Sequence, residues 1–179
     1  PAVLPPGLIL GAHPPRADPR DAWVSPHAPG PATLPQRARV GTSSLRRQCQ
    51  LLASRPDLEI VPIRGSVETR LNKIASDGLH AVVLAAAGLE RLGLGHHIAQ
   101  RLAPETMLPA VGQGILAVEI RESDPAVAAR VAVLEDVDAR LAALAERAML
   151  AGLGGSCQVP IAGHAVRMPD GRWWLRGLV

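Results

Sequence analysis

The middle of this 179-residue chain repeats one order three times: a short apolar segment, a turn of small residues and an amphipathic helix. The apolar segments begin at residues 40, 58 and 81. The second helix, which Ser66 is suited to cap, places three apolar residues on one stripe: Val67, Leu71 and Ile74. Apolar strands that alternate with helices favour a parallel or mixed sheet covered on both faces. We therefore expect an α/β fold.

The first of the three turns, within residues 41–50, has the composition of an anion site. Three hydroxyl residues precede a helix that opens with Arg46 and Arg47. A helix N-terminus attracts anions, and guanidinium groups suit carboxylate or phosphate. Adjacent arginines point about 100° apart on a helix, so one anion need not bind both. Ligands of such sheets bind beyond the strands' carboxyl ends, where we expect these side chains to collect: Thr42, Ser44, Arg46, Arg47, Arg64 and Arg70.

Several of these candidates have a second interpretation that the residues alone leave open. Arg70 could instead form an ion pair with Glu68 or Asp77, and the sequence leaves both ligand binding and ion pairing open for Arg64 and Arg70. Gln113, which stands between two glycines, indicates either a close approach of the backbone to another segment or a flexible hinge.

The two cysteines have different surroundings in the sequence. Cys49 shares an apolar stripe with Leu45 and Leu52, which predicts a position in the core. Cys157 follows a run of small residues, so its sulfur is expected to be open to approach. Most single cysteines are inert, and by itself Cys157 is a weak candidate nucleophile.

The composition narrows the classes of partner. The chain has 19 basic and 16 acidic residues, no Phe or Tyr and three Trp, which argues against a nucleic-acid surface. No membrane span is expected, because no apolar run reaches about 18 residues. Two cysteines cannot form a disulfide framework, so a cytoplasmic setting is the default. The histidines lack ligand spacing, and metal binding is not expected. The charge balance of the chain fits an anionic small molecule as its partner better than a nucleic acid.

The later part of the chain gives further expectations. Residues 115–120 are predicted to form a strand, residues 138–151 a helix, and residues 168–171 a hairpin turn. The chain begins without Met and stops after a strand-like run at 173–179, so both ends look cut from something longer.

Five motifs in this order resemble the porphobilinogen deaminase (hydroxymethylbilane synthase) family. They are the arginine turn, Arg64-Gly65, residues 85–88, residues 108–114 and the Cys157 loop. The resemblance covers nearly every residue and implies periplasmic-binding-protein-like mixed-sheet domains, followed by the start of a small α+β C-terminal domain. It implies these boundaries: remnants of domain 1 at 1–19 and 113–134, domain 2 at 20–110, and part of domain 3 at 137–179.

The resemblance also implies a function, that of a monomeric transferase of tetrapyrrole, porphyrin and haem biosynthesis. Such an enzyme joins four porphobilinogen units, with loss of ammonia, on a dipyrromethane cofactor held covalently through Cys157. Arg91 is implied to bind the incoming substrate. The residues implied to hold the cofactor and the growing chain are Thr42, Ser44, Arg46, Arg47, Arg64, Arg70, Gln113 and Gly114.

The family's catalytic aspartate matches a position upstream of Pro1. We therefore expect no catalytic residue within the chain and no activity from the chain alone. The leading alternative is a small-anion binding module without catalysis, in which the same arginines serve but Cys157 has no role. A third interpretation is a truncated gene product without a function.

Overall fold

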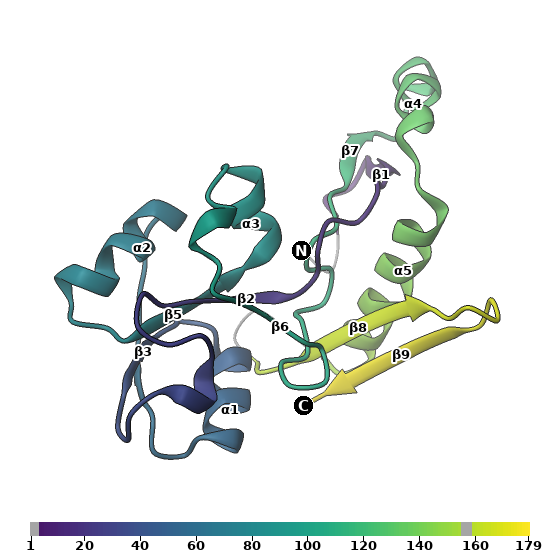
Figure 1. Cartoon of the computed structure of the whole chain (residues 1–179). Helices are drawn as coiled ribbons and strands as arrows, with labels where there is room; N and C mark the ends of the chain where they lie inside the picture. The colour runs from purple at the N-terminus through teal and green to yellow at the C-terminus, as the bar shows by residue number, and fades with distance from the viewer. Residues whose placement is uncertain (1–3, 155–158) are drawn as a thin grey trace.

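The computed structural model of the protein describes residues 4–154 and 159–179 and contains three sheets (Figure 1). The largest sheet has five strands in the order β4-β3-β5-β2-β6. Strand β3 pairs in parallel with β4 and β5, whereas β2 pairs antiparallel with β5 and β6. The mixed sheet expected from the sequence is therefore confirmed. The strands are β2 (Asp21–Val24), β3 (Arg39–Gly41), β4 (Glu59–Val61), β5 (Ala81–Ala85) and β6 (Gln100–Leu102).

Helices cover both faces of this sheet, as expected. Helix α1 (Leu45–Ser54) packs on one face, where Val83 of β5 meets Trp23 and Leu51. Helices α2 (Val67–Ser76) and α3 (Ala86–Arg91) pack on the other, where Val82 points. The predicted apolar stripe of α2 packs on the core, and Ser66 caps this helix by accepting from the Thr69 amide at 3.2 Å. Successive residues of β5 are buried on opposite faces, which explains why its sequence is uniformly apolar.

The prediction that Cys49 lies in the core is wrong. Cys49 is exposed, and Leu45, on the same stripe, is 44% exposed. Helix α1 instead turns Arg46, Arg47 and Leu51 inward. The reason is electrostatic, because both arginines bind a buried carboxylate beneath the helix, and this contact sets the rotation of the helix about its axis.

Two smaller sheets complete the fold. Strand β1 (Leu8–Ala12) pairs antiparallel with β7 (Val118–Arg121), next to α4 (Pro125–Val131). Strands β8 (Ala162–Arg167) and β9 (Trp173–Leu178) form an antiparallel pair packed on α5 (Val137–Gly152), which gives the expected α+β arrangement. The predicted helix and hairpin turn are confirmed. The part of the chain that the structure describes also has three short 3₁₀ helices: η1 (Pro31–Thr33), η2 (Gly95–His97) and η3 (Ala132–Leu134).

Two predicted boundaries differ from the structure. The strand expected at 115–120 starts at Val118, because residues 111–114 form a turn and pairing with β1 starts only at Val118. The third of the expected small-residue turns, which follows the apolar segment at 81, is absent: Ala85 ends β5, and α3 begins at once with Ala86 and Ala87, whose residue type has high helix propensity. Among the described residues, no helix is long and apolar enough to cross a membrane.

Candidate functional site

The carboxyl ends of β3 and β4 meet at one edge of the five-stranded sheet. The Thr42 amide donates to the Val61 carbonyl at 2.9 Å, and Ser43 Oγ donates to the Ile63 carbonyl at 2.6 Å. These bonds tie the first and second predicted turns together. Thr42 is buried, and Ser44 is the N-cap of α1. The first and second turns therefore lie at the same edge of the sheet.

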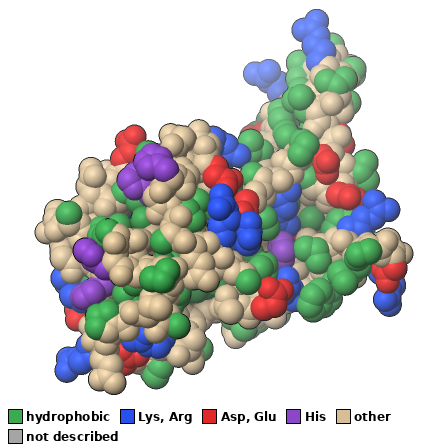
Figure 2. All heavy atoms as spheres, viewed as in Figure 1, with side chains coloured by type: hydrophobic (Ala, Val, Ile, Leu, Met, Phe, Trp, Pro, Cys, Tyr) green, Lys and Arg blue, Asp and Glu red, His purple; other side chains and the backbone are tan. Residues whose placement is uncertain are grey.

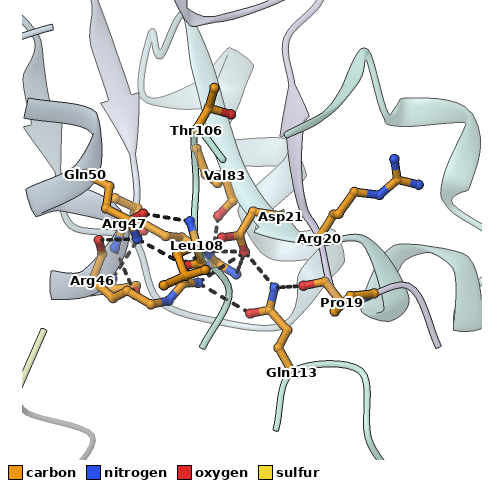
Figure 3. Close-up of polar contacts among 12 residues, drawn as sticks. Pro19, Arg20, Asp21, Arg46, Arg47, Gln50, Val83, Thr106, Leu108 and Gln113 are labelled. Carbon is orange, nitrogen blue, oxygen red and sulfur yellow. Dashed lines mark hydrogen bonds and ion pairs between the residues drawn. The ribbon is translucent and has the colours of Figure 1, made fainter. Parts of the chain in front are cut away.

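The sequence did not predict that one buried carboxylate, Asp21, would bind both arginines of α1 (Figure 3). Arg46 Nη1 lies 2.7 Å from Asp21 Oδ2, and Arg46 Nη2 lies 3.2 Å from Oδ1. Arg47 donates to Asp21 Oδ1 from Nε at 3.0 Å and from Nη2 at 2.8 Å. Asp21 is fully buried, and Arg46 and Arg47 are 5% and 9% exposed. We call Asp21, Arg46, Arg47 and Gln113 the Asp21 cluster.

The charges of the cluster follow from burial and pairing. Burial favours the neutral form of Asp21, but Arg47 and Arg46 outweigh burial and hold the pKa of this carboxyl below its ordinary value. Burial lowers the pKa of Arg47 despite the opposing effect of Asp21. Two guanidinium groups and one carboxylate leave a net charge of one positive unit, which suits a further carboxylate.

Gln113 joins the cluster to the segment before β2. Its Nε2 donates to the Pro19 carbonyl at 2.6 Å and to Asp21 Oδ1 at 3.0 Å. The neighbouring Gly114 has φ +83°, and a Cβ there would lie 2.6 Å from the Ala17 carbonyl oxygen. Of the two interpretations that the sequence left open for Gln113, the structure favours a close backbone approach.

A second buried carboxylate, Glu146 of α5, links this helix to the segment before β2, to the turn at residues 111–114 and to β8. It is fully buried and accepts from Arg16 Nη1 at 2.7 Å and Nη2 at 3.3 Å. It also accepts from the backbone amides of Gly112 at 2.6 Å and Ala165 at 2.7 Å. Arg16 Nε in turn donates to the Gln113 carbonyl at 3.0 Å, so the Glu146 contacts continue into the Asp21 cluster. The sequence did not predict that Glu146 would be buried.

His164 of β8 lies beside these contacts and is 5% exposed. Burial, together with the charges of Arg16 and Arg176, lowers its pKa to about 4, against a small opposite effect of Glu105. Arg176 of β9 binds Glu105 at 2.6 Å, which links the C-terminal hairpin to the loop after β6.

The remaining predicted site residues differ in their exposure. Arg64 and Arg91 are exposed, and Arg70 is half-buried with its Nε donating to the Gly65 carbonyl at 2.9 Å. Asp77, a suggested partner of Arg70, pairs with Lys73 at 3.1 Å instead. Cys157 lies outside the described residues. The binding roles of all these residues stay predictions.

Outside the Asp21 cluster, the structure has charged and apolar areas on its surface. Figure 2 shows basic and acidic side chains next to each other near the middle of the viewed face. The ion pairs of the fold include Arg20–Asp18 at 2.7 Å and Arg101–Asp18 at 3.1 Å. A mainly apolar hollow of about 850 Å³ lies elsewhere, between η1, the end of α1 and Leu178. In the part of the chain that the structure describes, no group of three or more His, Cys, Asp or Glu could hold a metal ion.

Comparisons with known proteins identify close relatives. Residues 1–129 match the family model "porphobilinogen deaminase, dipyromethane cofactor binding domain", and residues 140–179 match "porphobilinogen deaminase, C-terminal domain". Porphobilinogen deaminase of Syntrophotalea carbinolica is 56% identical over 92% of this chain and 52% of its own length. The enzymes of that name from Roseiflexus sp. (strain RS-1) and Nitratidesulfovibrio vulgaris are 51% and 50% identical over 100% of this chain, and over 59% and 56% of their own lengths. The chain thus spans little more than half the length of these curated relatives.

Among solved structures, similarity is much weaker. A periplasmic binding protein of Salmonella typhimurium, described as highly specific for arginine, aligns with 80% of this chain and 62% of its own. The identity is 14% and the TM-score 0.39, so this likeness supports no statement about fold or ligand.

Proposed function

The chain belongs to the porphobilinogen deaminase family, and from this premise we propose that it is part of an enzyme that joins four porphobilinogen molecules into a linear hydroxymethylbilane. One ammonia leaves for each unit added. The enzyme would be a transferase (hydroxymethylbilane synthase) of tetrapyrrole, porphyrin and haem biosynthesis. Porphobilinogen is its proposed substrate.

The observation that carries this proposal is the pair of buried arginines, Arg46 and Arg47, at the start of α1, where two turns of the mixed sheet meet. The turns after β3 and β4 are hydrogen-bonded to each other, and they bring the N-termini of α1 and α2 to the same edge. The Asp21 cluster adds one net positive charge there. Every pyrrole unit of the substrate and product carries an acetate and a propionate, so a growing chain is a polycarboxylate. Charge-assisted hydrogen bonds from arginine suit such a ligand.

The same donors fit the dipyrromethane cofactor, which carries carboxylates of the same kind. We assign its binding to Thr42, Ser44, Arg46, Arg47, Arg64, Arg70, Gln113 and Gly114, with covalent attachment at Cys157 and with Arg91 facing the incoming porphobilinogen. When bound, the cofactor supplies the free pyrrole carbon to which the next unit is joined. The residues of this chain would orient that cofactor by its carboxylates. No residue of the chain is assigned a catalytic role.

We also propose the domain boundaries 1–19 with 113–134, 20–110, and 137–179. The arrangement of sheets supports them, because β1 and β7 fall in the first unit, the five-stranded sheet in the second, and β8 and β9 in the third. A cytoplasmic setting fits the proposal, since thioether formation needs the thiol of Cys157 in its reduced state. The proposed enzyme is a monomer.

The proposal is tested by intact-mass measurement of the full-length parent protein. We expect the wild-type protein and a Cys49→Ala variant to carry a dipyrromethane adduct and to form hydroxymethylbilane from porphobilinogen. Cys49 is a matched control, because it is exposed and lies outside the assigned attachment. The Cys157→Ala variant should carry no adduct and form no product. A wild-type protein that binds carboxylates but has neither adduct nor product would contradict the proposal and favour a simple binding module.

A further inference from the structure

Asp21 draws together two side chains that helix geometry would separate. Residues 46 and 47 are adjacent on α1, so their side chains leave the helix about 100° apart. In the structure both guanidinium groups nevertheless reach the same carboxylate, at 2.7 Å for Arg46 and 2.8 Å for Arg47. Asp21 comes from β2, the strand next to β5, and it lies fully buried under the start of α1. One internal anion therefore orients both arginines.

Each arginine has a second anchor on the backbone of a different segment. Arg46 Nη1 donates to the Leu108 carbonyl at 2.6 Å, and Arg47 Nη1 donates to the Val83 carbonyl at 3.0 Å. A planar guanidinium that is held at two points cannot rotate out of its plane without breaking a bond. The bonds described here occupy three of the five N–H groups of Arg47, so the remaining two keep a fixed direction.

Asp21 is itself held in place, and a carboxylate close to it in the sequence has other partners. Gln113 Nε2 donates to Asp21 Oδ1 at 3.0 Å (Figure 3). Asp18, three residues earlier, binds Arg20 and Arg101 and not the arginines of α1. Figure 3 also shows Arg20 pointing away from Asp21. Among the described residues, Asp21 is the carboxylate that contacts both members of the arginine pair.

We propose that Asp21 is a positioning residue, which fixes the orientation of the Arg46 and Arg47 guanidinium groups and leaves one net positive charge for a carboxylate of the cofactor or growing chain. This inference rests on the proposed function. A binding group that is already oriented loses little freedom when the ligand arrives, so its interaction contributes more fully to affinity. Without the Asp21 charge, two neighbouring guanidinium groups would repel each other in a buried site.

The test uses the full-length parent protein, with Asp21→Asn as the main variant and Asp57→Asn as the matched control. Asp57 also binds an arginine next to α1, Arg55 at 2.7 Å, but it lies outside the site. For Asp21→Asn we expect the fraction of protein with covalent cofactor to fall, and the KM for porphobilinogen to rise about tenfold with a smaller change in kcat. The control should keep the wild-type loading and KM within about twofold. A purely structural role would lower the unfolding midpoint without this change in KM.

A second variant, Asp21→Glu, keeps the charge but moves the carboxylate by one methylene group, and it decides the question if Asp21→Asn does not fold. Positioning requires that Asp21→Glu also raise KM several-fold. Wild-type KM and cofactor loading in Asp21→Glu would overturn the inference, because the negative charge alone would then be enough and its exact position would not matter. Wild-type KM and loading in a folded Asp21→Asn would also overturn it, because neither the charge nor its position would then be needed. A wild-type protein without adduct and product would instead contradict the proposed function, and this inference with it.

Discussion

Replacing Arg16 with Met should destabilise the protein far more than the loss of an ordinary surface ion pair. The change removes the guanidinium group and keeps an apolar side chain of similar length. Glu146, which is fully buried, would lose its charged partner at 2.7 Å and keep only the two backbone amides of Gly112 and Ala165. Removing one member of a buried ion pair typically costs about 3–5 kcal/mol, because the remaining charge is left uncompensated.

The matched control is Arg140→Met. Arg140 also binds a glutamate, Glu135 at 2.8 Å, but its side chain is 46% exposed. Exposed ion pairs contribute about 0–1 kcal/mol, so the control should unfold close to the wild-type midpoint.

Two measurements check this prediction. Urea unfolding gives the total loss of stability, and amide hydrogen exchange at Ala165, which donates to Glu146, gives the local one. A loss of about 3–5 kcal/mol corresponds to exchange at Ala165 roughly 100- to 5,000-fold faster than in the wild-type protein. If Arg16→Met cost less than about 1 kcal/mol, or left Ala165 as protected as in the control, Glu146 would not depend on Arg16 and the reasoning would be refuted.

Three further predictions concern the rest of the fold. Because the pKa of His164 is lowered to about 4 in the folded protein, the unfolded chain binds a proton at this residue more readily, and stability should fall as pH drops from about 6.5 toward 4. The urea midpoint should therefore decrease between pH 7 and 5, and His164→Gln should make this decrease smaller. Gly114→Ala should destabilise the protein clearly more than Gly112→Ala in thermal melts, since both glycines have positive φ but only Gly114 abuts a backbone carbonyl; equal losses would refute the steric argument. Cys49 should react with a thiol reagent in the folded protein at close to the rate of a free thiol; protection would restore the core assignment.

The sequence predicted those features that depend on local spacing. The apolar stripe of α2 and its Ser66 cap are both encoded within about ten residues, and both were predicted correctly. The rotation of α1 was not, because it is set by Asp21, which lies 25 residues before Arg46 and reaches it only through the order of strands in the sheet.

The same limit applies to the contacts between units. Glu146 lies on the buried face of α5 with Ala139, Ala142 and Ala143, and only its pairing with Arg16, 130 residues away, explains why a charge is buried there. Gln113 left two interpretations open because the partner of its turn, Ala17, lies in a segment that the local pattern does not identify. In each case the decisive partner is remote in the sequence.

The strand order has a consequence for the time course of synthesis. Strand β1 pairs with β7, and Leu8 of β1 faces Arg121 of β7. Strand β2 lies between β5 and β6, which come some sixty to eighty residues later in the chain. At about 5–20 residues per second, β1 waits roughly 5–20 s on the ribosome before its partner has been made. During that interval the edge of β1 that pairs with β7 is open to other chains, so we expect the nascent protein to be more prone to aggregation before residue 121 emerges than after it.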